Sequence, residues 1–145
     1  MFEINDDNLR FSVTPFERIT DNDIDPITHT WDWIKVYIEF AVIGLTSQFE
    51  TSFTVGELTE LKASVKKVQA ALENHATTNV IFDSLERQIS ITFGTLTGSD
   101  GVSVSLILRP EGLPESAEIT YTFFIDQSYF DGIFARINKM ISWQN

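Results

Sequence analysis

The sequence predicts an α+β fold, in which a largely antiparallel, twisted β-sheet of about seven strands carries two amphipathic helices on one face. Three observations lead to this prediction. The first half of the chain alternates apolar and polar residues, as half-buried strands do. The period then becomes helical between residues 58 and 72, and strands followed by a second helical pattern complete the chain. Runs of strands separated by single helices favour antiparallel pairing over a doubly wound sheet.

Three stretches in the first half have the alternation of strands. The first, Leu9–Val13, is interrupted by Pro15. The second, Ile34–Phe40, alternates most cleanly, and the third is Phe49–Val55. A polar loop, Asp21–Thr30, separates the first two. We therefore expect a sheet whose apolar side is built by these strands.

A single amphipathic helix is expected next. Its apolar stripe has 3-4-3-4 spacing and consists of Leu58, Leu61, Val65, Val68 and Leu72. Thr54 and Glu57 have the spacing of a capping box, which places the start of the helix there. Asn74 and His75 are expected to close it.

Strand patterns recur at Val80–Leu85, Arg87–Phe93, Val102–Leu108 and Ile119–Ile125. A final helix follows Asp126, which is a suitable N-cap residue. The polar side of these strands is expected to be solvated and carries Thr92, Ser103, Ser105, Glu118, Thr120 and Thr122. The length of 145 residues suits one domain, so we expect residues 1–145 to form a single α+β domain.

The composition limits the possible partners. With 21 acidic and 10 basic residues the formal net charge is −11, which disfavours nucleic acid and anionic membranes as partners. A basic protein would be attracted instead, although acidity for solubility alone is the simpler explanation. The chain has no cysteine and no signal-peptide pattern at its start, so we expect a cytoplasmic protein.

No catalytic motif stands out, and we expect a protein that is not an enzyme and has no cofactor. Asp21, Asp23, Asp25 and Asp32 have the spacing of positions 1, 3, 5 and 12 of a calcium loop. However, Pro26 occupies the position at which that loop needs glycine for its turn. We therefore interpret the segment as an acidic solvated loop and expect no metal.

Two aromatic residues are candidates for partner binding. If Ile34–Phe40 turns its even-numbered side chains inward, Trp33 and Tyr37 point outward beside carboxylates. Exposed aromatic residues of this kind make good binding hot spots. The alternative is that loops or termini cover this side of the sheet, which would make Trp33 a core residue.

The chain resembles the WapI-type bacterial immunity proteins over roughly residues 2 to 141. The resemblance is carried by Asp32–Ile38, by Phe49 ahead of Glu57 and Leu58, and by Phe123–Tyr129 before the last helix. It implies a non-enzymatic protein that binds and neutralises a cognate toxin domain in the cell that makes it. Many such toxins are basic nucleases, which would suit an acidic inhibitor.

Our hypothesis is therefore a protein-binding domain whose partner is a basic toxin domain. The residues expected to contact that partner are Asp21, Asp23, Asp25, Asp32, Trp33 and Tyr37. One alternative is a small-molecule-binding or enzymatic domain with a pocket between sheet and helices. Another is a structural subunit that forms homo-oligomers, and the sequence leaves the oligomeric state open.

Overall fold

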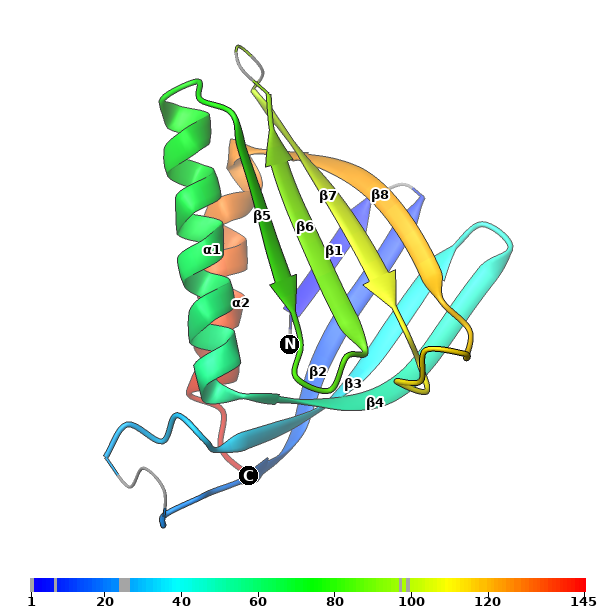
Figure 1. Cartoon of the computed structure of the whole chain (residues 1–145), viewed down its shortest axis with the longest axis vertical. Helices are drawn as coiled ribbons and strands as arrows, with labels where there is room; N and C mark the ends of the chain where they lie inside the picture. Colours follow the sequence, from blue (N-terminus) through cyan, green and yellow to red (C-terminus); the bar gives the residue numbers. More distant parts are fainter. Residues whose placement is uncertain (1, 7, 24–26, 97, 99) are drawn as a thin grey trace. The chain divides into compact units, whose positions relative to one another are not determined.

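The computed structural model describes residues 2–6, 8–23, 27–96, 98 and 100–145 (Figure 1). It contains eight strands, two α-helices and one short 3-10 helix, which confirms the α+β class. The elements of the first half are β1 (Phe2–Asp6), β2 (Leu9–Ile19), β3 (Trp33–Val42), β4 (Leu45–Thr54) and α1 (Val55–Glu73). Those of the second half are β5 (Thr78–Asp83), β6 (Ile89–Thr95), β7 (Gly101–Leu108), β8 (Ile119–Asp126), η1 (Gln127–Tyr129) and α2 (Phe130–Ile141).

The prediction of one sheet with about seven strands is wrong. The strands form two antiparallel sheets of four, in the orders β1-β2-β3-β4 and β5-β6-β7-β8. The strand that the sequence did not reveal is β1, which is short and ends in residues that strands disfavour. Alternation shows which side of a strand is buried, but it does not show which strands pair, so the partition into two sheets had no sequence signal.

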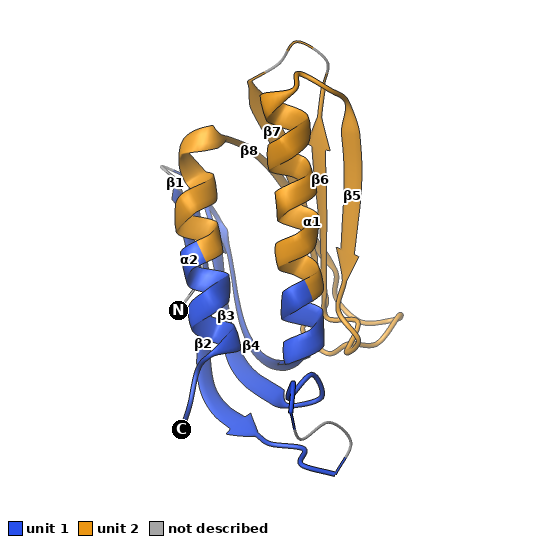
Figure 2. Ribbon diagram, turned by 90° about the vertical axis from the view of Figure 1, so that its left-hand side faces the viewer, with its two compact units in different colours: residues 1–59, 135–145 blue, residues 60–134 orange. Residues whose placement is uncertain are grey.

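The chain divides into two compact units (Figure 2). Unit 1 comprises Met1–Thr59 and Ala135–Asn145, and unit 2 comprises Glu60–Phe134. Most of α1 thus belongs with the second sheet, and the last part of α2 belongs with the first sheet. The expectation that both helices pack on one face of a sheet stays a prediction. The assignment of residues 1–145 to a single domain stays a prediction.

The core of unit 1 is centred on β3, whose alternation was predicted. The inward side chains of this strand are at most 1% exposed and are Ile34, Val36, Ile38 and Phe40. On the neighbouring strands Phe11 lies opposite Phe40 and Phe49 lies opposite Ile38. These contacts bury large apolar surfaces on one side of the sheet, so the outward side of β3 is available for polar and amphipathic residues.

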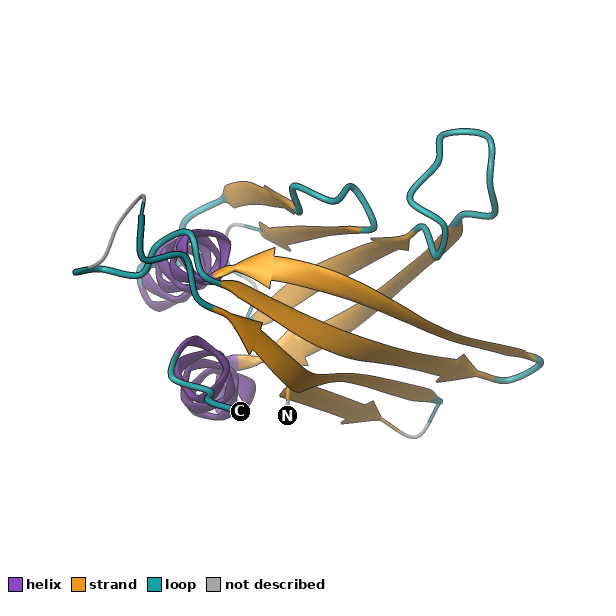
Figure 3. Ribbon diagram, turned by 90° about the horizontal axis from the view of Figure 1, so that it is seen from below, coloured by secondary structure: helices purple, strands orange, loops and turns teal. Residues whose placement is uncertain are grey.

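Pro15 does not end β2, contrary to the interruption expected there. The strand continues to Ile19 past an irregularity in its pairing with β3 between Pro15 and Glu17. On the other side β1 pairs with β2 only from Leu9 to Val13. Pro15 therefore lies beyond the end of β1. Proline has no N–H to donate, and at this position no residue of β1 needs a hydrogen bond from it. The long strands of the first sheet are visibly twisted (Figure 3).

The capping box at the start of α1 is confirmed. Thr54 Oγ1 accepts from the Glu57 backbone N–H at 3.1 Å, and Glu57 Oε2 accepts from the Thr54 N–H at 2.6 Å. Gly56 follows the cap because a Cβ there would lie 2.8 Å from Cγ2 of Thr30. The start of α1 is thus held against the loop that precedes β3. At its other end α1 stops at Glu73, and His75 has a positive φ of 52°, as suits a helix end.

Asp126 is an N-cap residue, as predicted, but it caps η1 rather than α2 directly. Its carboxylate accepts from the Ser128 backbone N–H at 2.9 Å and from the Ser128 hydroxyl at 2.5 Å, and these bonds lower the pKa of Asp126. Within the described residues neither helix is both long and apolar enough to cross a membrane.

Candidate protein-binding site

The predicted site residues that the structure describes all lie in unit 1. Trp33 and Tyr37 are on the outward side of β3 and are half-buried. Asp21 and Asp23 are in the loop between β2 and β3, and Asp25 lies outside the described residues. Asp32 is different from the others because its side chain is only 1% exposed.

The outward side of the first sheet brings further residues next to Trp33 and Tyr37. Directly opposed residues of antiparallel strands point to the same side. Trp33 therefore lies beside Ile19, Lys35 beside Glu17, and Tyr37 beside Glu50. We refer to these residues as the Trp33 face: Glu17, Ile19, Trp33, Lys35, Tyr37 and Glu50.

The Trp33 face combines an apolar pair with mostly negative charge. Ile19 is 44% exposed next to the half-buried indole, so Trp33 is not a core residue. Lys35 is in an exposed ion pair with Glu17 at 3.1 Å, and Glu50 is exposed next to Tyr37. Sequence reasoning missed Ile19, Glu17 and Glu50, because their place beside β3 depends on a pairing register that the sequence does not state.

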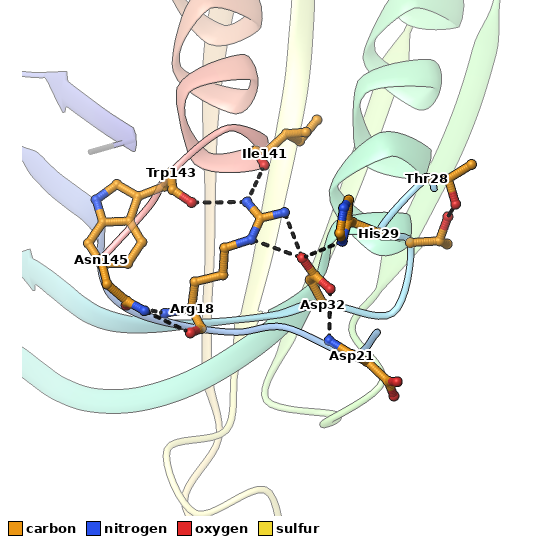
Figure 4. A network of polar contacts seen from close by, with 9 residues as sticks. Arg18, Asp21, Thr28, His29, Asp32, Ile141, Trp143 and Asn145 are labelled. Carbon is orange, nitrogen blue, oxygen red and sulfur yellow. Dashed lines mark hydrogen bonds and ion pairs between the residues drawn. The ribbon is translucent and has the colours of Figure 1, made fainter. Parts of the chain in front are cut away.

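The acidic loop is fixed at its end by a buried ion pair. Asp32 Oδ2 accepts from Arg18 Nη2 at 2.8 Å and from Arg18 Nε at 3.0 Å (Figure 4). The other carboxylate oxygen accepts from the backbone N–H of Asp21 at 2.9 Å. Nδ1 of His29 lies 3.4 Å from Oδ2, so a protonated imidazole would add a second positive charge. Asp32 thus joins the two ends of the loop and stands immediately before Trp33.

Arg18 also holds the last residues of the chain. Its Nη1 donates to the backbone carbonyls of Ile141 at 2.8 Å and Trp143 at 2.9 Å (Figure 4). A guanidinium at this position satisfies carbonyls at the C-terminus of α2 and suits the helix dipole. The Asn145 side chain bonds the Arg18 backbone N–H at 2.8 Å and carbonyl at 3.1 Å. One arginine therefore connects the loop, β2 and the C-terminal segment.

The electrostatics of Asp32 follow from these contacts. Burial by itself would raise the pKa of this carboxyl, but the hydrogen bond from Asp21 N and the Arg18 guanidinium together outweigh it. The pKa of Asp32 is therefore held below its ordinary value. A carboxylate engaged in this way is not available to wrap a cation, and no metal-binding group of three or more residues is present in the part of the chain that the structure describes.

The lowered pKa predicts a loss of stability in acid. Since the unfolded Asp32 titrates near pH ~3.9 and the folded one lower, the unfolded chain binds more protons as the pH falls through this window. The contribution of Asp32 to the free energy of unfolding is therefore present above pH ~4 and is lost as the pH falls below that value. The free energy of unfolding then decreases by at most about 1.4 kcal/mol per pH unit. Carboxyl NMR of the folded chain should give an Asp32 pKa below 3.9. A value above 4.5 would contradict the predicted direction.

Other parts of the acidic loop are held locally. Asp21 Oδ1 accepts from the Asp23 backbone N–H at 3.1 Å, which is an Asx-type turn. Asp23 itself is exposed. His29 adopts a positive φ of 55°, and Asp32 N donates back to its carbonyl at 3.0 Å. The exposed carboxylate of Asp23 is therefore the one best placed to meet a partner among the described loop residues.

A pocket is present in unit 2, whereas these residues belong to unit 1. It has a volume of about 630 Å³ and lies at the β5–β6 and β7–β8 turns. Charged side chains of both signs line it, including Asp83, Arg87, Arg109 and Glu118. Arg109 and Glu118 are paired at 3.1 Å. This is a polar pocket between loops, and the alternative of a pocket between sheet and helices stays a prediction.

The fold and site define a class, a small acidic α+β protein whose candidate aromatic residues lie on the outward side of β3, next to a loop that carries candidate acidic residues. The Immunity protein WapI-like family matches residues 1–144, and the chain belongs to that family. Membership implies a protein partner, a toxin, and a role that is generally not enzymatic. The chain matches none of the curated proteins.

Two solved plant structures are similar in outline. The plant transcriptional regulator PBF-2 matches with a TM-score of 0.49 and 8% identity, covering 97% of this chain and 79% of that chain. WHY3 from Arabidopsis thaliana matches with a TM-score of 0.47 and 11% identity, covering 96% and 84% respectively. At these TM-scores the likeness supports no conclusion about function.

Proposed function

We propose that this chain is a cytoplasmic immunity protein that neutralises a basic toxin domain by binding it, without catalysing a reaction. The family assignment supports a toxin as the partner. The observation that carries the choice of surface is the Trp33 face, where exposed Ile19 and the half-buried Trp33 and Tyr37 lie beside acidic residues, next to the acidic loop. Aromatic anchors surrounded by polar groups are the usual composition of a binding hot spot.

Charge supports a basic partner. A net charge of −11 attracts a cationic protein over distances of about a Debye length, roughly 8–10 Å at physiological salt. The loop carboxylates Asp21, Asp23 and Asp25 then guide the encounter, while Trp33 and Tyr37 provide the apolar contact after docking. In this proposal Asp32 acts from the interior, because its buried pair with Arg18 fixes the loop and the start of β3.

Reversing the loop charge should slow association. In the double variant Asp23→Lys/Asp25→Lys the net charge falls in magnitude from −11 to −7, since each exchange adds two units. We expect the association rate with the cognate toxin domain to drop about tenfold at low salt, and its salt dependence to flatten. Stopped-flow association at two salt concentrations measures both.

The matched control is Glu111→Lys/Glu115→Lys, which makes the same charge change at two exposed positions of unit 2. This control should keep most of the wild-type rate. Equal slowing by both pairs would mean that total charge matters and the loop does not, and unchanged rates in the loop variant would remove the loop from the interface.

A further inference from the structure

The pocket of unit 2 lies where two connections of the second sheet come together. The starts of β6 and β8 both pair with the end of β7, so the β5–β6 and β7–β8 connections leave the sheet at the same end (Figure 1). Arg109 N donates to the Gln88 carbonyl at 2.8 Å, and Gln88 Nε2 donates to the Pro110 carbonyl at 2.9 Å. Gly112 approaches so closely that a Cβ there would lie 3.3 Å from Cγ of Gln88. The walls of the pocket are therefore held in place by the protein itself.

Arg87 has an unusual backbone conformation in the β5–β6 connection. Its φ of 59° lies in the left-handed region, where side chains are disfavoured and glycine is the usual residue. The Arg87 backbone N–H donates to the Ser84 carbonyl at 3.0 Å, which closes the turn. The turn therefore keeps an arginine where glycine would adopt the conformation more easily. Strained positions of this kind are concentrated at functional sites.

The charged side chains of the pocket are only partly paired with one another. Arg109 Nε lies 3.1 Å from Oε2 of Glu118, so these two residues form an ion pair in the wall. Arg87 and Asp83 also line the pocket. Neither of these two side chains has a hydrogen bond or an ion pair with any residue in the part of the chain that the structure describes. One cation and one anion therefore remain to bind a ligand.

We propose that this pocket binds a short peptide of two or three residues that has both ends free and carries apolar side chains. Arg87 binds the carboxylate of the peptide, because a planar guanidinium can pair with a carboxylate through two parallel hydrogen bonds. Asp83 binds the ammonium group at the other end. Leu85 and Pro114 are exposed apolar residues of the lining, and they contact the apolar side chains. This site goes beyond the proposed function, since it involves no toxin.

Size and charge favour such a peptide over other ligands. The volume of about 630 Å³ lies within the range of pockets that hold drug-sized ligands, which favours a peptide over a single amino acid. A zwitterion has no net charge, so the net charge of −11 does not repel it as it repels a phosphate or a nucleotide. A simple cation would meet Arg87, and a simple anion would meet Asp83. A ligand with one charge of each sign pairs with both residues.

The dipeptide Leu-Leu is the probe for this site, and we expect it to bind weakly. Asp83 and Arg87 are both exposed, so water competes for each charge. The expected Kd is on the order of 0.1–1 mM. An NMR titration of the isotope-labelled chain, carried to roughly ten times that Kd, should shift the amide signals of residues 83–88 and 109–118. The signals of β3 and β4 in unit 1 should stay in place.

Blocked peptides test which end of the ligand meets which residue. Acetyl-Leu-Leu lacks the ammonium group and Leu-Leu-amide lacks the carboxylate, so each should bind about tenfold more weakly than Leu-Leu. Asp83→Asn should weaken Leu-Leu about tenfold but leave acetyl-Leu-Leu unchanged, because the group that Asp83 meets is already missing. Arg87→Gln should weaken Leu-Leu but leave Leu-Leu-amide unchanged, for the same reason.

Glu86→Gln and Lys67→Gln are the matched controls. They make the same two charge changes at exposed positions of unit 2 that lie outside the lining of the pocket. Both should leave the Kd of Leu-Leu within about twofold of wild type. Arg87→Gly tests the role of the strained arginine. Because glycine suits a φ of 59°, this variant should be at least as stable as wild type to heat, yet bind Leu-Leu no better than Arg87→Gln does.

Several results would overturn this proposal. One is that the signals of residues 83–88 do not shift at the highest Leu-Leu concentration. Another is that Leu-Leu and both blocked peptides bind equally well, because neither charge would then be used. A third is that Asp83→Asn weakens binding no more than Glu86→Gln does. Since the test uses this chain and a peptide without the toxin, its failure would not affect the proposed function, and failure of toxin binding would not affect this site.

Discussion

Asp32→Asn should lower the free energy of unfolding by about 3–5 kcal/mol at pH 7, which is the usual cost of leaving one partner of a buried ion pair alone. Arg18 is only 7% exposed and would keep its charge with no carboxylate beside it. Asparagine has nearly the same shape, so the loss reports the charge and not a cavity. Urea unfolding followed by tryptophan fluorescence measures the change.

The control for this variant is another ion pair of the same sheet. Glu17 and Lys35 lie 3.1 Å apart, but their side chains are 46% and 40% exposed. Solvent screens such a pair, so Glu17→Gln should change stability by less than about 1 kcal/mol. If Asp32→Asn cost no more than Glu17→Gln, the account of the buried pair as the anchor of the acidic loop would be wrong.

A double replacement separates the pair from the other bonds of Arg18. Arg18→Met/Asp32→Leu removes both charges, and apolar replacement of a buried pair is often close to neutral. However, the carbonyls of Ile141 and Trp143 would lose the donor that Arg18 provides. We therefore expect the double variant to be more stable than Asp32→Asn but less stable than wild type.

Trp33→Ala should weaken the toxin complex by at least about 2 kcal/mol, or roughly thirtyfold in Kd, mainly through faster dissociation. The indole is half-buried beside Ile19 on the outward side of the sheet, whereas the core is on the inward side. Its truncation should therefore reduce binding far more than folding. Surface plasmon resonance with the toxin domain and thermal unfolding of the free variant measure the two effects.

Phe124→Ala is the matched aromatic truncation in unit 2, and at nanomolar concentration it should leave toxin affinity within about twofold of wild type, because it removes no proposed contact. Loss of affinity in Phe124→Ala with none in Trp33→Ala would place the toxin on the other sheet.

Local patterns allowed much of the fold to be predicted. The burial of alternate residues in β3 follows from a period of two, and the start of α1 follows from a capping box four residues long. Both depend on neighbours in the sequence. The division into two sheets and the strand β1 were not predicted, because pairing between strands depends on contacts that are distant in the sequence.

The candidate site was predicted only in part. Trp33 and Tyr37 were expected to face outward, and they do so because they alternate with the core residues of β3. Asp32 was grouped with the solvated loop acids, yet it is buried against Arg18, which lies 14 residues earlier. An aspartate in an acidic segment gives no local sign of such a partner. Only the register that brings the end of β2 beside the start of β3 reveals it.

The most direct test of the proposed binding surface is amide hydrogen exchange of this chain with and without its cognate toxin domain. If the toxin domain binds the Trp33 face, amide exchange should slow in residues 17–23 and 27–37, and exchange in β5–β8 should stay unchanged. Residues 33–37 already pair with β2 and β4 in the first sheet, so added protection there would report contact or tightening of that region. Protection confined to residues 78–126, or none at all in a saturated complex, would contradict the account.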